Sequence, residues 1–524
     1  MVNPTETNFD ASRAWSSLAV VILGTFLSAI SATTISVALP TIMNVFGVSL
    51  SDVQWVVTGY AMAMAIIIPL APYLSRVFSS ERVYLFAMAI FISFSTLGAF
   101  SWSLHAMLLF RIMQAIGGGL MQPIGMGMIV ALFPPHKRGV AFGVFGIAAM
   151  AAPAFGPTLG GYIVQFFSWH YIFFINLPVG LVGIALGLKF FQFGARIPFP
   201  KFDVSGFISA TIGSGLLLYL VGKNTEIDWN DPYYVYILII GVGSLVFFVV
   251  NELYSESPLL DLRILKNRNF SVSLVLTVIQ MTMLMSVSYV LPVFLQDFKG
   301  LSAMHSGQVL LPASLVMAVL MPVAGRISDA VGENGTKVVI ALGIALAGSA
   351  TFFLATKINM SVSIISITMV ASIRNVGLGV AMMPARTLGL VNIMPKDSTK
   401  ATAMSSFIAQ FSSSLTVAFV TLMVSNRLNA TYAYATSQVT ALNTPFNEAV
   451  HTLVVNFISK GMSVADATNN AAIMVMQDVY INDYCLAIEH TILIVALVGV
   501  IGVLVIPFFK TSKQKKNEAK ELKA

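Results

Sequence analysis

The sequence is a series of long apolar runs separated by short polar segments, and this pattern constrains the fold more than any other feature. A hydrocarbon core about 30 Å thick requires roughly 20 apolar residues per helix. Charged residues make up 10% of the chain, whereas a soluble protein carries about 25%. The sequence therefore predicts an all-α polytopic membrane protein with fourteen transmembrane helices, which begin near residues 15, 53, 83, 105, 139, 169, 204, 232, 270, 305, 337, 361, 401 and 486.

Basic residues gather in alternate connections between these runs. With the N-terminus inside, the inner segments contain Arg13, Arg76, Arg82, Lys137, Arg138, Lys189, Arg196, Lys201, Arg263, Lys266, Arg268, Arg326, Lys337, Arg386, Lys396, Lys400 and the lysines of the tail. The outer segments contain only Lys223, Lys299, Lys357, Arg427 and Lys460. Because cytoplasmic loops are enriched in Lys and Arg, we expect a multi-pass protein of the cytoplasmic (inner) membrane with both termini in the cytoplasm. These loops also explain the net charge of +7, so no nucleic-acid partner is expected.

Two parts of the chain resemble each other. The stretch SVALPTIMNVFGVS (36–49) aligns with SYVLPVFLQDFKGLS (288–302), and PLAPYLSRVFSS from residue 69 aligns with PVAGRISDAVGE from residue 322. We interpret the chain as two six-helix halves, residues 1–202 and 270–510, joined by two linking spans and a cytoplasmic loop over 203–269; a long outer loop covers 428–485 and a basic cytoplasmic tail covers 511–524. Two repeats with a site at their interface are typical of secondary transporters.

Five stretches together are typical of one family. They are ISATTISVALP in span 1, LLFRIMQAIGGGLMQP in span 4, PAFGPTLGG in span 5, WHYIFFINLPVG in span 6, and GRISDAVG between spans 10 and 11. The chain resembles the major facilitator superfamily over essentially its whole length, and within it the fourteen-span drug:proton antiporters of bacterial multidrug export.

This resemblance implies a major facilitator fold and a secondary active exporter of amphiphilic small molecules, driven by the proton gradient through alternating access. In a Gram-negative cell it also implies a periplasmic adaptor as a partner. Two alternatives stay open. One is export of an endogenous anionic amphiphile, such as a fatty acid or lipid; the other is a membrane sensor or channel that performs no active transport.

Span 5 is unusually rich in helix-disrupting residues: Pro153, Gly156, Pro157, Gly160 and Gly161. Glycines four residues apart leave a bare face on which a neighbouring helix can approach closely. Proline removes intrahelical hydrogen bonds and bends a helix at a fixed place. The family carries a Gly-Pro pattern associated with export here, so we interpret these five residues as a conformational motif; ordinary close packing is the alternative.

Two arginines lie inside spans, where a charge costs at least about 2.5 kcal/mol and therefore needs a reason. Arg111 in span 4 shares a helix face with Gln114, and Arg374 is its counterpart in span 12. The resemblance implies a role for Arg111 in proton transfer or in the contact with span 1; the alternative is a structural arginine bonded to backbone carbonyls. In GRISDAVG, Gly325 allows the helix end to turn, and Asp329 can contact basic side chains or helix N-termini of the other half. In the family this motif latches conformational states.

Span 1 departs from the family pattern, because Ser31 and Ser36 stand where fourteen-span antiporters carry an aspartate and an asparagine. The residue that carries the coupling proton is therefore open. Substrate is expected near mid-membrane between the halves, among methionines that can repack and near the candidate residues Ser28, Ser31, Thr34, Gln114, Gln122, Gln280, Tyr289 and Gln410. Polar residues in spans also serve as contacts between helices, and this alternative holds for each of them.

Other chemistries have no sequence support. The chain contains no GxxxxGK[ST] loop for ATP, and its six histidines show no metal-ligand spacing. We expect no cofactor, no metal and no enzymatic activity.

Overall fold

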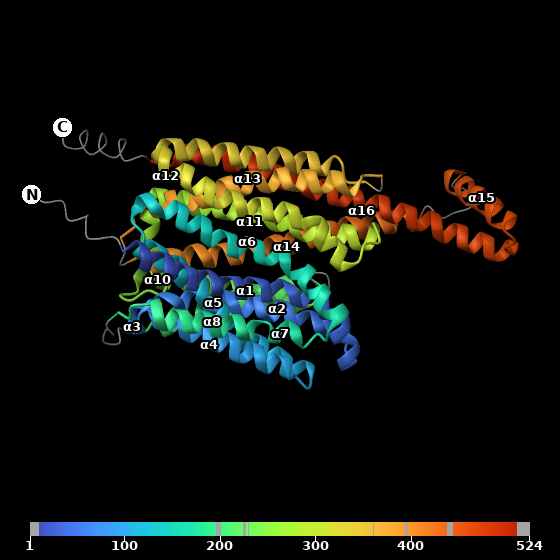
Figure 1. The fold of residues 1–524 in the computed structure, drawn as a ribbon. Helices are drawn as coiled ribbons and strands as arrows, with labels where there is room; N and C mark the ends of the chain where they lie inside the picture. Colours follow the sequence, from blue (N-terminus) through green and yellow to red (C-terminus); the bar gives the residue numbers. More distant parts are fainter. Residues whose placement is uncertain are drawn as a thin grey trace, which may run out of the picture.

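The computed structural model of the protein describes residues 10–194, 201–223, 227–228, 230–359, 361–391, 393–394, 397–437 and 444–510. These residues form a bundle of long helices (Figure 1). The helices are α1 (Ala11–Phe46), α2 (Leu50–Ile67), α3 (Ala71–Phe78), α4 (Ser80–Ala99), α5 (Leu104–Leu132), α6 (Arg138–Phe166), α7 (Tyr171–Phe174), α8 (Asn176–Phe190), α9 (Val204–Gly222), α10 (Pro232–Tyr254), α11 (Arg268–Val293), α12 (Ala303–Ala355), α13 (Ile364–Leu390), α14 (Ser398–Ser437), α15 (Thr444–Ser459) and α16 (Val464–Val505). Short helical turns include η1 (Ile68–Leu70), η2 (Pro135–Lys137), η4 (Leu262–Lys266), η5 (Phe294–Phe298) and η7 (Ile506–Phe508).

The fourteen predicted spans correspond to helices of this bundle, and the all-α membrane fold is confirmed. Among the described residues, twelve helices are long and apolar enough to cross a membrane. One of them, α12, contains Gly332 with non-helical φ 68° and ψ −175°, so it represents the two spans expected from residues 305 and 337. Helix α6, with 29 residues, accounts for the span expected from residue 139.

The local sequence explains several helix ends. Gly47 ends α1 in the left-handed region, φ 63°, which glycine adopts without steric cost. Ser49 then begins α2 with a capping box, in which Asp52 accepts from the Ser49 backbone N–H at 3.3 Å. Asp203 begins α9 in a similar way by accepting from the N–H of Gly206 at 2.8 Å. Both carboxylates therefore act as helix caps.

The connection over 428–485, predicted as a long outer loop, is largely helical in its described residues. Helix α14 continues to Ser437, and α16 begins at Val464, far ahead of the span start predicted at 486. Helix α15 packs against α16, and together they project well beyond the rest of the bundle (Figure 1). We call this projecting side the distal end, and the opposite side, where α1 begins and η7 ends, the terminal end.

The two halves lie side by side, with α6 and α14 between them (Figure 1). Helices α9 and α10 pack on each other, and α9 contacts both α2 and α14. The stacked rings of Trp55 and Tyr219, with centroids 5.6 Å apart, fix α9 against α2. The two inserted helices thus cover one side of the seam between the halves.

Candidate functional site

Arg111 on α5 is the centre of a buried polar cluster in the first half. Its side chain is 1% exposed. Nη1 donates to Ser31 Oγ at 3.0 Å and to Gln114 Oε1 at 2.8 Å, and Nη2 donates to the Ser31 carbonyl at 3.2 Å. Nε donates to the Val56 carbonyl at 3.4 Å. The structure thus brings together three of the predicted residues, and the guanidinium joins α5 to both α1 and α2.

Tyr60 on α2 completes this cluster and was missed by the sequence analysis. The Arg111 guanidinium lies 4.2 Å from the centre of the Tyr60 ring, a favourable cation–π distance. Tyr60 donates its hydroxyl to the Ser28 carbonyl at 3.3 Å. A Cβ on Gly118 would lie 2.7 Å from Ser28 Oγ and 2.8 Å from the Tyr60 hydroxyl, so glycine makes room for both. The only sequence signal was a tyrosine in the middle of an apolar span.

Arg374 on α13 occupies the corresponding place in the second half and is 2% exposed. Its Nη1 donates to Asn375 Oδ1 at 2.8 Å, and its Nη2 donates to the carbonyls of Leu284, at 3.1 Å, and Met283. These contacts join α13 to α11, as Arg111 joins α5 to α1. Gln280, earlier on α11, is also buried, at 1% exposure.

The glycines of α6 pack against α1. A Cβ on Gly160 would lie 2.5 Å from the Thr34 carbonyl oxygen, and one on Gly156 would collide with Thr33 Oγ1. Gly161 faces Met304 of α12, where a Cβ would lie 3.1 Å from the Met304 Cβ. Thr34 uses its hydroxyl within α1, donating to the Ile30 carbonyl at 2.7 Å. The side chains of Pro153 and Pro157, which carried the prediction of a bend, fall outside the described part of α6.

At the terminal end, Asp329 joins the two halves. Its Oδ1 accepts from the N–H of Gly139 at 3.2 Å and its Oδ2 from the N–H of Val140 at 3.1 Å, at the start of α6. A Cβ on Gly325 would collide with the Gly139 carbonyl, so the α6 and α12 backbones touch here. A carboxylate at a helix N-terminus bonds free N–H groups and complements the helix dipole. Asp329 thus contacts a helix N-terminus of the other half, and its role as a latch stays a prediction.

A second contact between the halves at the terminal end joins α5 to α14. Thr402 Oγ1 donates to the Pro123 carbonyl at 3.0 Å, and Ser398 Oγ donates to the Gly127 carbonyl at 3.5 Å. A Cβ on Gly127 would lie 2.9 Å from Thr399 Oγ1. Both seams between the halves are therefore closed at this end.

Arg386, near the terminal end of α13, is a third buried arginine, at 6% exposure. From the sequence, Arg386 was predicted only to be one of the basic residues of the inner segments. Its Nη1 lies 3.6 Å from the thioether sulfur of Met126 on α5, across the seam between the halves. Ser406 on α14 donates to the same sulfur at 3.8 Å.

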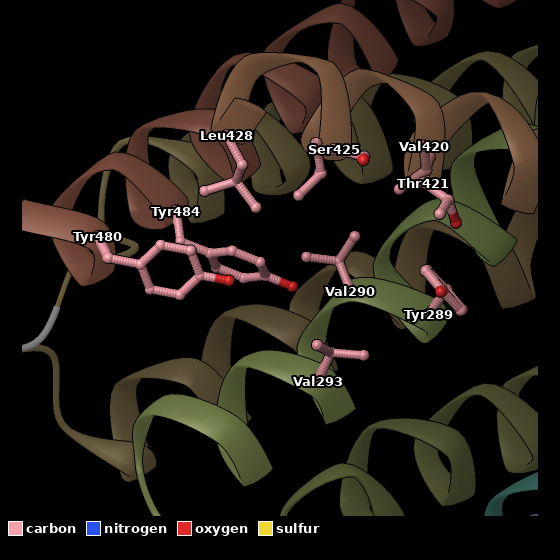
Figure 2. A pocket seen from close by; sticks show the side chains of 10 residues that line it. Tyr289, Val290, Val293, Val420, Thr421, Ser425, Leu428, Tyr480 and Tyr484 are labelled. Atoms are coloured by element: carbon pink, nitrogen blue, oxygen red, sulfur yellow. The ribbon is translucent and has the colours of Figure 1, made fainter. Parts of the chain in front are cut away.

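Tyr289 lines a cavity of about 440 Å³ towards the distal end of the second half (Figure 2). Its walls come from α11, α14 and α16, and Tyr480 and Tyr484 close one side (Figure 2). The other lining residues are Val290, Val293, Val420, Thr421, Val424, Ser425 and Leu428. An apolar cavity with a few hydroxyl groups suits an amphiphilic ligand.

The predicted pocket residues are thus dispersed over the bundle and do not line one pocket. Ser28, Ser31 and Gln114 belong to the Arg111 cluster, whereas Tyr289 lines the distal cavity. Gln122 on α5 and Gln410 on α14 are half-buried.

The arrangement of two six-helix halves with paired arginines defines a membrane transporter fold built from a repeat. The family model for the Major Facilitator Superfamily matches residues 21–420, and the chain belongs to this superfamily. The resemblance stated from the sequence motifs is therefore confirmed.

Relatives and solved structures agree with this assignment. The chain is 32% identical to the uncharacterized MFS-type transporter YhcA of Bacillus subtilis over 86% of this chain and 84% of that protein. It is 32% identical to the lincomycin resistance protein LmrB of Listeria monocytogenes (78% and 86%) and 26% identical to the multidrug export protein EmrB of Escherichia coli (85% and 86%). The proton:xylose symporter XylE has the same fold, with a TM-score of 0.60, 15% identity and 95% coverage of both chains.

Proposed function

We propose that this protein is a secondary active exporter of amphiphilic small molecules, and that substrate crosses the membrane as the two halves alternate between open and closed seams. The observation that carries this proposal is the closure at the terminal end. Asp329 accepts from the start of α6, and Thr402 donates to the Pro123 carbonyl, so hydrogen bonds join the halves here beside the packing of α6 on α12. Hydrogen bonds of this kind can be broken and remade as the halves move. The names of LmrB and EmrB support a drug or toxic compound as substrate.

We assign the terminal end to the cytoplasm, because the basic connections predicted to be inner lie on that side. The structure then represents a state that is closed to the cytoplasm. The proton gradient is the proposed energy source. A serine hydroxyl at position 31 carries no charge at any relevant pH, so the coupling proton binds at another group.

A second candidate function is export of an endogenous anionic amphiphile, such as a fatty acid. The observation that favours it is the charge of the interior. Arg111, Arg374 and Arg386 are all buried, and among the described residues none of the three forms an ion pair of the kind that joins Lys400 to Asp261. A cationic substrate in this interior would be opposed by like charge.

A partner protein is also part of the proposal. In a cell with two membranes, a periplasmic adaptor would contact the projecting helices α15 and α16, because they extend furthest from the bundle (Figure 1).

The test is flux into proteoliposomes that contain the purified protein and carry an imposed pH gradient. An exporter accumulates a fluorescent amphiphile against its concentration gradient, and a protonophore abolishes this accumulation. A channel would only equilibrate the probe, and a sensor would give no flux; either result would overturn the proposal.

A further inference from the structure

The three buried arginines differ in how well the protein satisfies them. A guanidinium offers five N–H donors. Arg111 makes four hydrogen bonds to oxygen acceptors and Arg374 makes three. Both are therefore held in place by acceptors of their own half, although Nε of Arg374 is buried without a partner among the described residues.

Arg386 is different. Within the described residues, its hydrogen-bonding contact is the Met126 sulfur at 3.6 Å, and a thioether is a weak acceptor. Arg138, which is equally buried at 6%, shows that a structural arginine near this end can be satisfied: it donates to the carbonyls of Phe133 at 3.0 Å and Val130 at 2.8 Å. A buried charge without a strong partner is costly. Arg386 therefore keeps guanidinium donors available for a further acceptor.

The surroundings of Arg386 are suited to an apolar chain attached to an anion. Met126 of the first half meets Arg386 and Ser406 of the second half. One turn before Arg386 on α13, Met383 reaches the Gly146 position of α6, where Met321 of α12 also lies. Methionine side chains are flexible and polarisable, and they repack around ligands of different shape.

Opening of the terminal end would expose this group. Arg386 and Met126 lie on opposite halves, so separation of α5 from α13 and α14 removes the sulfur contact and leaves the guanidinium facing the widening space. We propose that Arg386 binds the anionic head group of an amphiphilic substrate, a carboxylate, sulfonate or phosphate, that enters from the terminal end. Met321 and Met383 accept its apolar chain. This inference rests on the proposed export function and specifies its substrate class.

The test uses three probes with the same twelve-carbon chain: dodecanoate, dodecanol and dodecyltrimethylammonium, all radiolabelled. Equilibrium binding is measured on the full-length protein in nanodiscs, with empty nanodiscs subtracted. Wild type is compared with Arg386→Gln, with Arg386→Lys, and with Arg76→Gln as a matched loss of charge at an exposed position on α3. Melting temperature and elution profile verify the fold of each variant.

Hydrogen bonds to a charged group change affinity by roughly tenfold to a hundredfold. We expect Arg386→Gln to weaken dodecanoate binding by about tenfold or more, Arg386→Lys to retain most of it, and Arg76→Gln and the other two probes to show no change. Met126→Leu, which removes only the sulfur partner, should leave dodecanoate binding intact or stronger, and it tests the site if Arg386→Gln does not fold. The inference is overturned if dodecanoate fails to bind wild type, binds Arg386→Gln equally well, or is lost with Met126→Leu.

Flux in proteoliposomes separates this inference from the proposed function. Binding that depends on Arg386 without concentrative flux would refute export but leave the anion site standing. Concentrative flux with anion binding that ignores Arg386 would support export and remove the site.

Discussion

The contact between α1 and α6 leads to a sharp prediction for Gly160→Ala. The new Cβ would lie 2.5 Å from the Thr34 carbonyl oxygen, whereas ordinary contact begins at 3.4 Å. The two helices must therefore separate by 3.4 − 2.5 = 0.9 Å at this point. Because the obstructing atom belongs to the backbone, no rotamer change can relieve the clash. Overpacking of this kind costs about 1–3 kcal/mol.

The separation should also reach the Arg111 cluster, because Thr34 lies one turn from Ser31 on α1. We expect Gly160→Ala to insert into the membrane, to melt at a lower temperature and to export more slowly. Gly243→Ala is the matched control, since Gly243 is exposed on α10 and its added Cβ meets nothing within 4 Å. The assays are thermal melting by size-exclusion chromatography and dye efflux at equal expression. Gly160→Ala with wild-type melting and efflux would refute the close approach as a structural requirement.

Three further changes probe other parts of the molecule. Asp329→Asn removes the negative charge at the start of α6, whose interaction with the helix dipole contributes about 0.3–1 kcal/mol and up to about 2 kcal/mol. We expect the variant to transport more slowly while it still binds substrate. A loss of substrate affinity with an unchanged turnover per bound substrate would contradict the role of Asp329 in joining the halves. Gly332→Ala places a side chain on a residue with φ 68° and ψ −175°, and its Cβ meets no atom within 4 Å. Backbone strain of about 1–3 kcal/mol should therefore be the sole cause of a lower melting temperature. An unchanged melting temperature would show that the backbone at residue 332 adopts another conformation without cost. Ser31→Asp places a carboxylate next to Arg111, whose Nη1 now donates to Ser31 Oγ at 3.0 Å. We expect the variant to export a cationic dye better, relative to an anionic amphiphile, than wild type does. Strong export of the cationic dye by wild type, unchanged by the substitution at position 31, would contradict the preference for anions.

The positions of the spans could be read from the sequence because hydropathy and helix length are local properties. The helical projection at the distal end could not be read from hydropathy, because it depends on where a helix ends and not on where it enters lipid. Residues 464–485 are too polar to cross a membrane, yet they continue the helix of α16 without a break. Hydropathy reports where a segment enters lipid, whereas backbone hydrogen bonding decides where its helix ends.

The candidate site was predictable in part. An arginine inside an apolar span is conspicuous, so Arg111 and Arg374 could be found, and the helix-terminus contact of Asp329 follows from the charge of its side chain. Tyr60, a partner of Arg111, could not be predicted as easily. It is distant from Arg111 in the sequence, and one tyrosine in an apolar span does not indicate which residue it contacts. Arg386 was read as a loop residue, since only packing shows that α13 extends far enough to bury it.

The energetics of the terminal end fit a protein that must open and close. Among the described residues, four hydrogen bonds to oxygen acceptors cross the seams there, two to Asp329, one from Thr402 and one from Ser398, beside the weaker contacts of Arg386 and Ser406 with the Met126 sulfur. At about 0.5–1.5 kcal/mol each, they contribute roughly 2–6 kcal/mol. Reversing a two-state population from 1:99 to 99:1 requires about 5.5 kcal/mol, so the differential binding of one ligand can offset the contribution of these hydrogen bonds; the packing of α6 on α12 and of α5 on α14 adds to the closure. The glycine contacts of Gly156 and Gly160 lie within the first half, between α1 and α6, and do not enter this sum. Because α6 packs against α12 of the second half as well as against α1, a relative movement of the halves requires the contact between α6 and α12 to change.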